Sequence, residues 1–287
     1  MPVIITPVSS WLLALVVLLV SVANGASLPE SKPVPGGIAV LPLGLRATGF
    51  APQVEYRKQR VMVLAAEGYW VALVGIPLDA QLGSGVIQVR DDQGSRSLAF
   101  TVQPQEYQSQ YLTLKNQRQV EPNPADLERI QREQAETREA FGHYHPQPGL
   151  VPWLELPVNA PQSSPFGLRR FFNNQPRAPH SGIDLAAARG TPVHSPAPGQ
   201  VIRVGDYFFN GRTVFLDHGE GLVTLYCHLE DITVREGQWL AQGEVLGHVG
   251  STGRATGPHL HWSVSLNDAR IDPALLLSRQ PPTRIRN

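Results

Sequence analysis

The segment Gly257-Pro-His-Leu-His-Trp-Ser-Val264 carries the clearest structural signal in the C-terminal half. It places two histidines, His259 and His261, on either side of Leu260. Side chains along a β-strand repeat every two residues, so a strand over this stretch directs both imidazoles to one face. Short apolar runs between glycine-rich turns continue from residue 158 to residue 277. We therefore expect an all-β domain with histidines gathered at one site.

A second pattern, His180-Ser-Gly-Ile-Asp184, offers further metal ligands. Neutral imidazole and carboxylate are good ligands for Zn²⁺, and His180, Asp184 and His261 together supply three. Three protein ligands leave one coordination position for water, which distinguishes a catalytic zinc from a structural one. We expect a catalytic Zn²⁺ here; the alternative is a hydrogen-bonded polar cluster without a metal.

Two further histidines can carry protons. A zinc-activated water needs a base, and the tetrahedral intermediate needs a donor. His228 and His259 are candidates for both tasks, and the residues alone leave open which performs which. Cys227, the only cysteine, adjoins His228, but strand alternation directs neighbouring side chains to opposite faces. We expect its thiol in the core, not acting as a nucleophile.

These patterns together resemble peptidase family M23, the zinc endopeptidases of the lysostaphin and LytM type, over roughly Pro157 to Leu277. The resemblance implies that His180, Asp184 and His261 bind zinc and that His228 and His259 are catalytic. It extends to the surrounding frame: Ser163-Ser-Pro-Phe-Gly-Leu-Arg169, Gly190-Thr-Pro-Val193, Asp217-His-Gly219 and Gly250-Ser-Thr-Gly253. The first half resembles the N-terminal region of exported Gram-negative members of the family.

The N-terminal half contains short β-type runs separated by turn signals and no histidine before His143. The runs at 38–43, 61–65, 70–76, 86–90 and 98–102 predict a small antiparallel β-sandwich-like domain. Asn123 as N-cap and Pro124 at the first helical position predict a helix over 123–141. Its apolar stripe is thin, so it should lie on a surface or between domains.

His143 and His145 follow this helix with the spacing of ligands on a strand. Gly142 and Pro146 flank them, and no third ligand is evident, so we interpret them as exposed loop residues. His194, His218 and His248 are isolated and are given no role.

The chain begins with an unbroken apolar run, Trp11 to Val20, followed by small residues. This pattern is typical of a signal peptide, although no Lys or Arg precedes it, and an uncleaved membrane tether is the alternative. We expect export to the periplasm or cell envelope. The predicted division is a signal peptide at 1–26, an N-terminal domain at 27–115, a helix and linker at 116–156, a zinc metallopeptidase domain at 157–278 and a tail at 279–287.

Charge excludes one class of partner. Lys and Arg total 24, as do Asp and Glu, so no net field attracts nucleic acid. The resemblance implies an endopeptidase that cuts peptide crosslinks of peptidoglycan, with the D-alanyl–diaminopimelate bond as the expected target. The first alternative is a murein-binding module that keeps zinc but activates a partner amidase; the second is a secreted peptidase that digests proteins.

Overall fold

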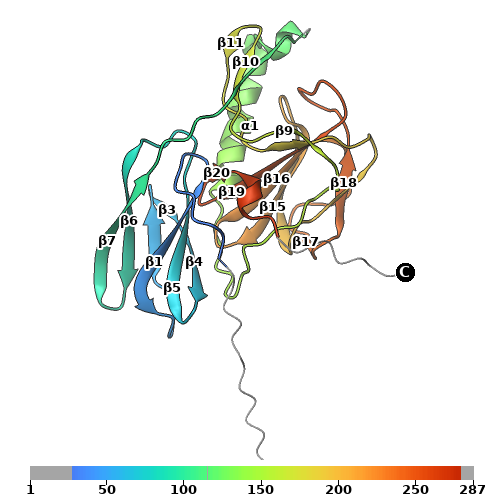
Figure 1. The fold of residues 1–287 in the computed structure, drawn as a ribbon. Coiled ribbons are helices and arrows are strands. Elements are labelled where there is room, and N and C mark those ends of the chain that lie inside the picture. The colour runs from blue at the N-terminus through green and yellow to red at the C-terminus, as the bar shows by residue number, and fades with distance from the viewer. Residues whose placement is uncertain (1–27, 115, 279–287) are drawn as a thin grey trace, which may run out of the picture.

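The computed structural model describes residues 28–114 and 116–278. The predicted signal peptide and C-terminal tail lie outside the described residues. Two β domains sit side by side, with one long helix beside the second (Figure 1). The expected fold class, two β-rich domains joined by a helix, is confirmed.

The N-terminal domain is a sandwich of two antiparallel sheets, with strand orders β1-β5-β4 and β3-β2-β6-β7. Residues of both sheets, including Val74, Ile87 and Val89, are fully buried in one shared core. The strand bounds are β1 Ile38–Arg46, β2 Gln53–Tyr56, β3 Gln59–Arg60, β4 Met62–Ala66, β5 Tyr69–Gly75, β6 Gly83–Asp91 and β7 Gly94–Val102. The five runs predicted from the sequence fall on β1, β4, β5, β6 and β7.

The C-terminal domain is built on a 10-stranded sheet whose main path is β17-β14-β15-β16-β19-β12-β9. Strand β18 pairs with β13 and β16, and β20 pairs with β19. The bounds are β9 Gln162–Ser164, β12 Ile183–Leu185, β13 Pro192–His194, β14 Gly199–Tyr207, β15 Gly211–Gly219, β16 Leu222–Ile232, β17 Trp239–Leu240, β18 Val245–Val249, β19 Leu260–Leu266, β20 Ala269–Ile271 and the 3-10 helix η2 Pro273–Leu275. Trp262 and Tyr226, on adjacent strands, are fully buried in its core.

The two domains share an apolar core. Met62 and Leu73 of the β1-β5-β4 sheet belong to the same buried cluster as Leu222 and Leu266 of the C-terminal domain. The sheet is therefore covered on both faces, by its sandwich partner on one and by the C-terminal domain on the other.

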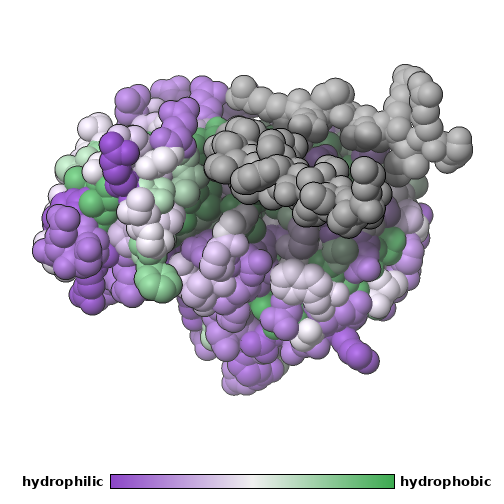
Figure 2. All heavy atoms as spheres, turned by 90° about the horizontal axis from the view of Figure 1, so that it is seen from below, coloured by the Kyte–Doolittle hydropathy of each residue, from purple (hydrophilic) through white to green (hydrophobic). Residues whose placement is uncertain are grey.

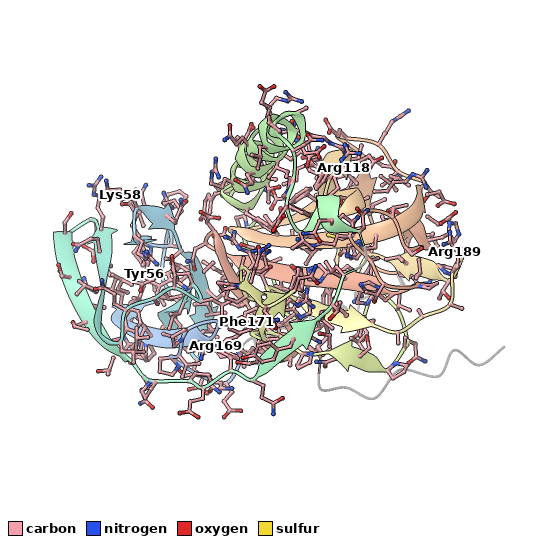
Figure 3. The ribbon with its side chains drawn as sticks, turned by 90° about the horizontal axis from the view of Figure 1, so that it is seen from above. Tyr56, Lys58, Arg118, Arg169, Phe171 and Arg189 are labelled. Carbon is pink, nitrogen blue, oxygen red and sulfur yellow. The ribbon has the colours of Figure 1, made fainter. Side chains whose placement is uncertain are left out.

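The connection between the domains passes close to the C-terminal sheet. Strand β8 (Ser109–Leu112) pairs in parallel with β10 (Arg169–Phe172), which pairs with β11 (Gln175–Pro176). Figure 3 shows Arg169 and Phe171 of β10 in this region, where the ring of Phe171 stacks on Tyr111 at 4.7 Å. A segment that leaves the first domain thus becomes part of the second.

The predicted helix is present as α1, Pro124–Phe141, after the 3-10 helix η1 (Gln117–Gln119). Asn123 caps it and forms a capping box with Asp126. Its C-terminal end is buried, because Ala140 and Phe141 pack against Tyr207 and Phe215 of β14 and β15.

Within residues 28–114 and 116–278, no helix is long and apolar enough to span a membrane. Seen from below in Figure 2, the described surface is mostly hydrophilic, with apolar residues showing in smaller patches.

Candidate metal centre and active site

Strand register brings Asp184 and His261 together. Asp184 of β12 lies directly opposite His261 of β19. Directly opposed residues in an antiparallel pair share a face of the sheet, so the carboxylate meets the imidazole. Gly182 permits the approach of β12, because a Cβ there would lie 2.4 Å from the carbonyl oxygen of Trp262.

His180 completes the group from the loop before β12. Its Nε2 lies 3.0 Å from Asp184 Oδ1 and 3.0 Å from His261 Nδ1, and the last two atoms are 2.8 Å apart. Its Nδ1 lies 2.7 Å from the carbonyl of Pro165, to which it donates. Donation from Nδ1 leaves the Nε2 lone pair directed at the other two atoms.

This donor set fits a zinc ion. Two imidazole nitrogens and one carboxylate oxygen from three buried or nearly buried side chains converge, which is the ligand type and number of an open zinc site. Within the described residues, this trio and a group of His143, His145 and Asp217 are the two sets of three such atoms that converge.

Two residues hold the ligands in orientation. Arg170 Nη2 donates to Asp184 Oδ2 at 3.1 Å, and Ser263 Oγ lies 2.9 Å from His261 Nε2. Partners of this kind fix ligand tautomers and directions. The oxygen of Asp184 that faces the histidines is thus left for a metal.

Electrostatics favour the ligating forms. Burial would raise the pKa of Asp184, but its close contacts with the imidazoles of His180 and His261 outweigh it and hold that pKa well below its usual range. Burial lowers the pKa of His261 to about 4, against the opposing effect of Asp184. The carboxylate is therefore ionised and the His261 imidazole is neutral at pH 7.

His228 and His259 form a second pair beside this trio. Their ring centroids are 4.8 Å apart, and His259 Nε2 lies 3.9 Å from Asp184 Oδ1. His228 donates from Nδ1 to the carbonyl of Thr252 at 2.8 Å, and His259 to that of Gly257 at 2.9 Å. Burial, followed by the nearby histidines, lowers the pKa of His228 to about 3, so its imidazole is neutral at pH 7.

One cavity of about 570 Å³ is lined by all five residues that the sequence singled out, His180, Asp184, His228, His259 and His261. A larger hollow of about 1120 Å³, beside Trp153 and Trp239, contains none of them. The five residues and the larger hollow are therefore in different places, and the converging ligands make the smaller cavity the candidate site.

Cys227 lies in the core, as predicted. Its side chain is 1% exposed, and burial raises the pKa of its thiol, so it stays protonated. Alternation of side chains along the strand does not by itself explain this burial. Cys227 pairs with His261 across the sheet, and β16 contains a register shift after Tyr226.

Two arginines at the site, Arg170 and Arg254, were not predicted from the sequence. The guanidinium of Arg254 lies 4.1 Å from the ring centroid of Phe209 and 4.8 Å from that of Phe172, and all three residues line the cavity. Ser263 could have been found, because it lies two residues after His261 on the same strand face.

Known proteins match both domains. Residues 178–273 match the sequence profile of peptidase family M23, and residues 31–105 match that of the peptidase family M23 N-terminal domain. A crystal structure described as peptidase M23 from Pseudomonas aeruginosa is 45% identical, with a TM-score of 0.73, and the match covers 86% of this chain and 95% of that one.

Two curated relatives match part of the chain. DD-carboxypeptidase/endopeptidase Mpg of Neisseria meningitidis serogroup B is 43% identical over 111 residues, covering 39% of this chain and 26% of the relative. Peptidoglycan DD-endopeptidase ShyA of Vibrio cholerae serotype O1 is 41% identical over 103 residues, covering 36% and 24%. The chain thus spans about a quarter of the length of these relatives.

Proposed function

The chain belongs to peptidase family M23, and we propose that it is a zinc-dependent endopeptidase that hydrolyses the peptide crosslinks of peptidoglycan. The observation that supports the proposal is the convergence of three ligand atoms and two further imidazoles in one cavity. A metal site alone would need only the three ligand atoms. Two additional proton-transfer groups beside it are what hydrolysis requires.

In this proposal His180, Asp184 and His261 hold the ion. Zn²⁺ bound there would lower the pKa of a water molecule toward about 7 and polarise the scissile carbonyl. Arg170 donates to Oδ2 of Asp184, which keeps Oδ1 directed at the ligand position. Ser263 orients His261 so that Nδ1 remains available.

His228 and His259 carry the proton and the oxyanion. Each uses Nδ1 to donate to a backbone carbonyl, so each presents Nε2 to the cavity. One accepts the proton of the attacking water at Nε2; the other, which must carry a proton on Nε2 as well as on Nδ1 to do so, donates a hydrogen bond to the developing oxyanion. The two rings lie close enough to act on one substrate group.

The substrate assignment is supported by the relatives. One is named DD-carboxypeptidase/endopeptidase and another peptidoglycan DD-endopeptidase. Residues 178–273, which match the family M23 profile, contain the five site residues. We propose the D-alanyl–diaminopimelate bond as the target. A peptidoglycan substrate places the protein in the cell envelope. Residues 1–26 would either direct its export or tether it to the membrane. We retain the division at 115/116 and 156/157 as part of the proposal.

The test is digestion of purified murein sacculi. Zinc-loaded protein is expected to convert crosslinked muropeptides to monomers, and chelator should stop the reaction until Zn²⁺ is restored. His228→Ala and His259→Ala should lose this activity, whereas His248→Ala, on an exposed His–Asp pair elsewhere, should keep it.

Two results would overturn the proposal. Sacculi that retain the protein while their muropeptides stay unchanged would favour a murein-binding module that activates a partner amidase. Casein digestion without muropeptide release would favour a general secreted peptidase.

A further inference from the structure

A second group of possible ligands lies where the linker after α1 meets the end of β15. His143 Nδ1 is 2.7 Å and His145 Nδ1 is 2.6 Å from the same atom, Oδ2 of Asp217. Asp217 is the third ligand that the sequence did not reveal for the two histidines, because it lies 72 residues after His145. We propose that these three residues form a second divalent-metal site, selective for zinc-like ions.

The buried charge of Asp217 supports the assignment. Its side chain is 0% exposed, and among the described residues its ion-pair partners are these two histidines, without a Lys or Arg. A buried carboxylate is costly unless its charge is compensated or a metal is coordinated. Neutral imidazoles give hydrogen bonds but no positive charge, whereas a cation shared with them supplies it.

The ligands are held in place before any metal arrives. Asp217 Oδ1 accepts from the backbone N–H of Gly219 at 2.8 Å, which leaves Oδ2 for the histidines. The backbone carbonyl of His145 accepts from Glu220 N, and Glu220 in turn accepts from Tyr144 Oη and from the backbone N–H of Gln147. The linker is thus fixed to the β15–β16 turn on both sides of His145.

The chain approaches so closely that Gly219 is required. A Cβ at this position, where φ is 95°, would lie 2.4 Å from Gln147 Cβ and 3.3 Å from His145 Nε2. Tyr144, between the two histidines, points away toward the N-terminal domain, where Arg60 lies 5.0 Å from its ring centroid. Alternation along the extended linker therefore places His143 and His145 together on the side of Asp217.

The geometry suits a small ion of intermediate softness. Ligand atoms about 2.0 to 2.1 Å from a tetrahedral zinc lie about 3.3 Å apart, so each imidazole must move back by about 0.6 to 0.7 Å from its present 2.7 or 2.6 Å. Both rings are partly at the surface, with 46% and 31% of the side chains exposed, which permits this movement and leaves a position for water. Two nitrogens among three ligands disfavour Ca²⁺ and Mg²⁺.

The site differs from the active site in position and consequence. The lining of the cavity that holds the five candidate residues includes none of His143, His145 and Asp217. An ion there joins the linker to the catalytic sheet and secures the end of α1 against it. Its expected effect is on stability and metal content, independent of hydrolysis.

The experiment measures how many metal ions each full-length chain retains. The protein is stripped with chelator, titrated with Zn²⁺ and freed of unbound ion before the metal is counted. Wild type is expected to retain two equivalents, matching the two converging groups. His261→Ala and His145→Gln should each retain one, and the double variant none. Gln preserves a donor to Asp217, so its loss of metal separates ligation from hydrogen bonding.

A matched control is His248→Gln, because His248 forms a similar pair with Asp231 at 2.7 Å but no third ligand among the described residues converges on the pair. It should retain two equivalents. Co²⁺ added to His261→Ala should give the visible absorption of a low-coordinate site. Wild type with one equivalent, or His145→Gln with two, would overturn the second site, and neither result bears on whether sacculi are digested.

Discussion

His228 adopts a left-handed backbone conformation, with φ of 63°, at an irregularity of strand β16. A non-glycine residue in this region costs about 1 to 3 kcal/mol and persists where the surrounding structure enforces it. The backbone N–H of His228 donates to the carbonyl of Asn210, and its Nδ1 donates to Thr252. The irregularity re-aims the side chain into the cavity, which regular alternation next to Cys227 would not do.

Ser263 offers a test of ligand orientation. Ser263→Ala removes the hydroxyl at 2.9 Å from His261 Nε2 and should weaken zinc affinity by about 10-fold, the lower end for such partners. Competition with a chromogenic chelator measures it. Ser265→Ala is the control, since that buried hydroxyl on the same strand has no partner among the described residues. Equal affinities in the two variants would refute the orienting role.

His218 predicts a pH dependence of stability. Burial lowers its pKa from 6.5 to about 4, so between these values the unfolded chain takes up a proton that the folded chain refuses. The free energy of unfolding should therefore fall as pH drops from 6.5 to 4, by about 3 kcal/mol in total from this group. Urea unfolding at a series of pH values measures it.

The control for this prediction uses a glutamine in place of each imidazole. His218→Gln can still donate to the carbonyl of Pro198 and should show a shallower acid slope. His194→Gln, at a partly exposed histidine, should keep the wild-type slope. The prediction fails if the His218 variant loses stability with acid as steeply as wild type.

The residues that could be predicted are those with distinctive chemistry at short spacing. His259 and His261 were placed together by strand periodicity, and all five candidates line one cavity. Arg170 and Asp217 could not be assigned to their partners, because each acts through contacts that depend on tertiary pairing, not on a local pattern. Arg170 is brought to Asp184 only when β10 folds against its neighbours.

At the scale of elements, the turn between β19 and β20 joins the two domains. Asn267 Oδ1 accepts from Gly75 N at 2.7 Å, and Asn267 Nδ2 donates to Gly75 O at 3.0 Å. Its φ of 46° is one that Asn tolerates better than most residues. Gly75 is needed opposite, because a Cβ there would lie 2.4 Å from Leu266 O.

Asn267→Ala is expected to lower the free energy of unfolding by about 3 kcal/mol. The substitution removes the side chain that hydrogen-bonds to both the N–H and the C=O of buried Gly75. Each buried group left without a partner costs about 1 to 3 kcal/mol. Denaturant unfolding gives the value. Asn174→Ala, at an exposed turn residue with φ of 64°, corrects for the backbone conformation. Equal losses in both variants would contradict the interdomain role.

Elements with strong local signals were predictable. The capping residues of α1 located its start, and branched or aromatic runs located the longer strands of the sandwich. Short strands such as β3, β8 and β11 carry too few residues for a periodic signal, and β8 exists because it pairs with β10, far along the chain. Tertiary pairing, not propensity, decides such strands.

At the scale of the whole molecule, the shared core makes the domains a single packed unit. Leu73 and Met62 on one side and Leu222 and Leu266 on the other are 0% exposed in one cluster. The first domain also sends β8 to β10, whose Arg170 supports Asp184. A domain without metal ligands thereby contributes to the position of the metal site.

The central claim is that His180, Asp184 and His261 share one zinc ion. Anomalous diffraction at the zinc edge, from crystals of the zinc-loaded full chain, tests it most directly. We expect an anomalous peak about 2.0 to 2.2 Å from His180 Nε2, Asp184 Oδ1 and His261 Nδ1, with a water molecule completing the coordination. A map with no zinc between these atoms, or with a fourth side chain in place of the water, would contradict it.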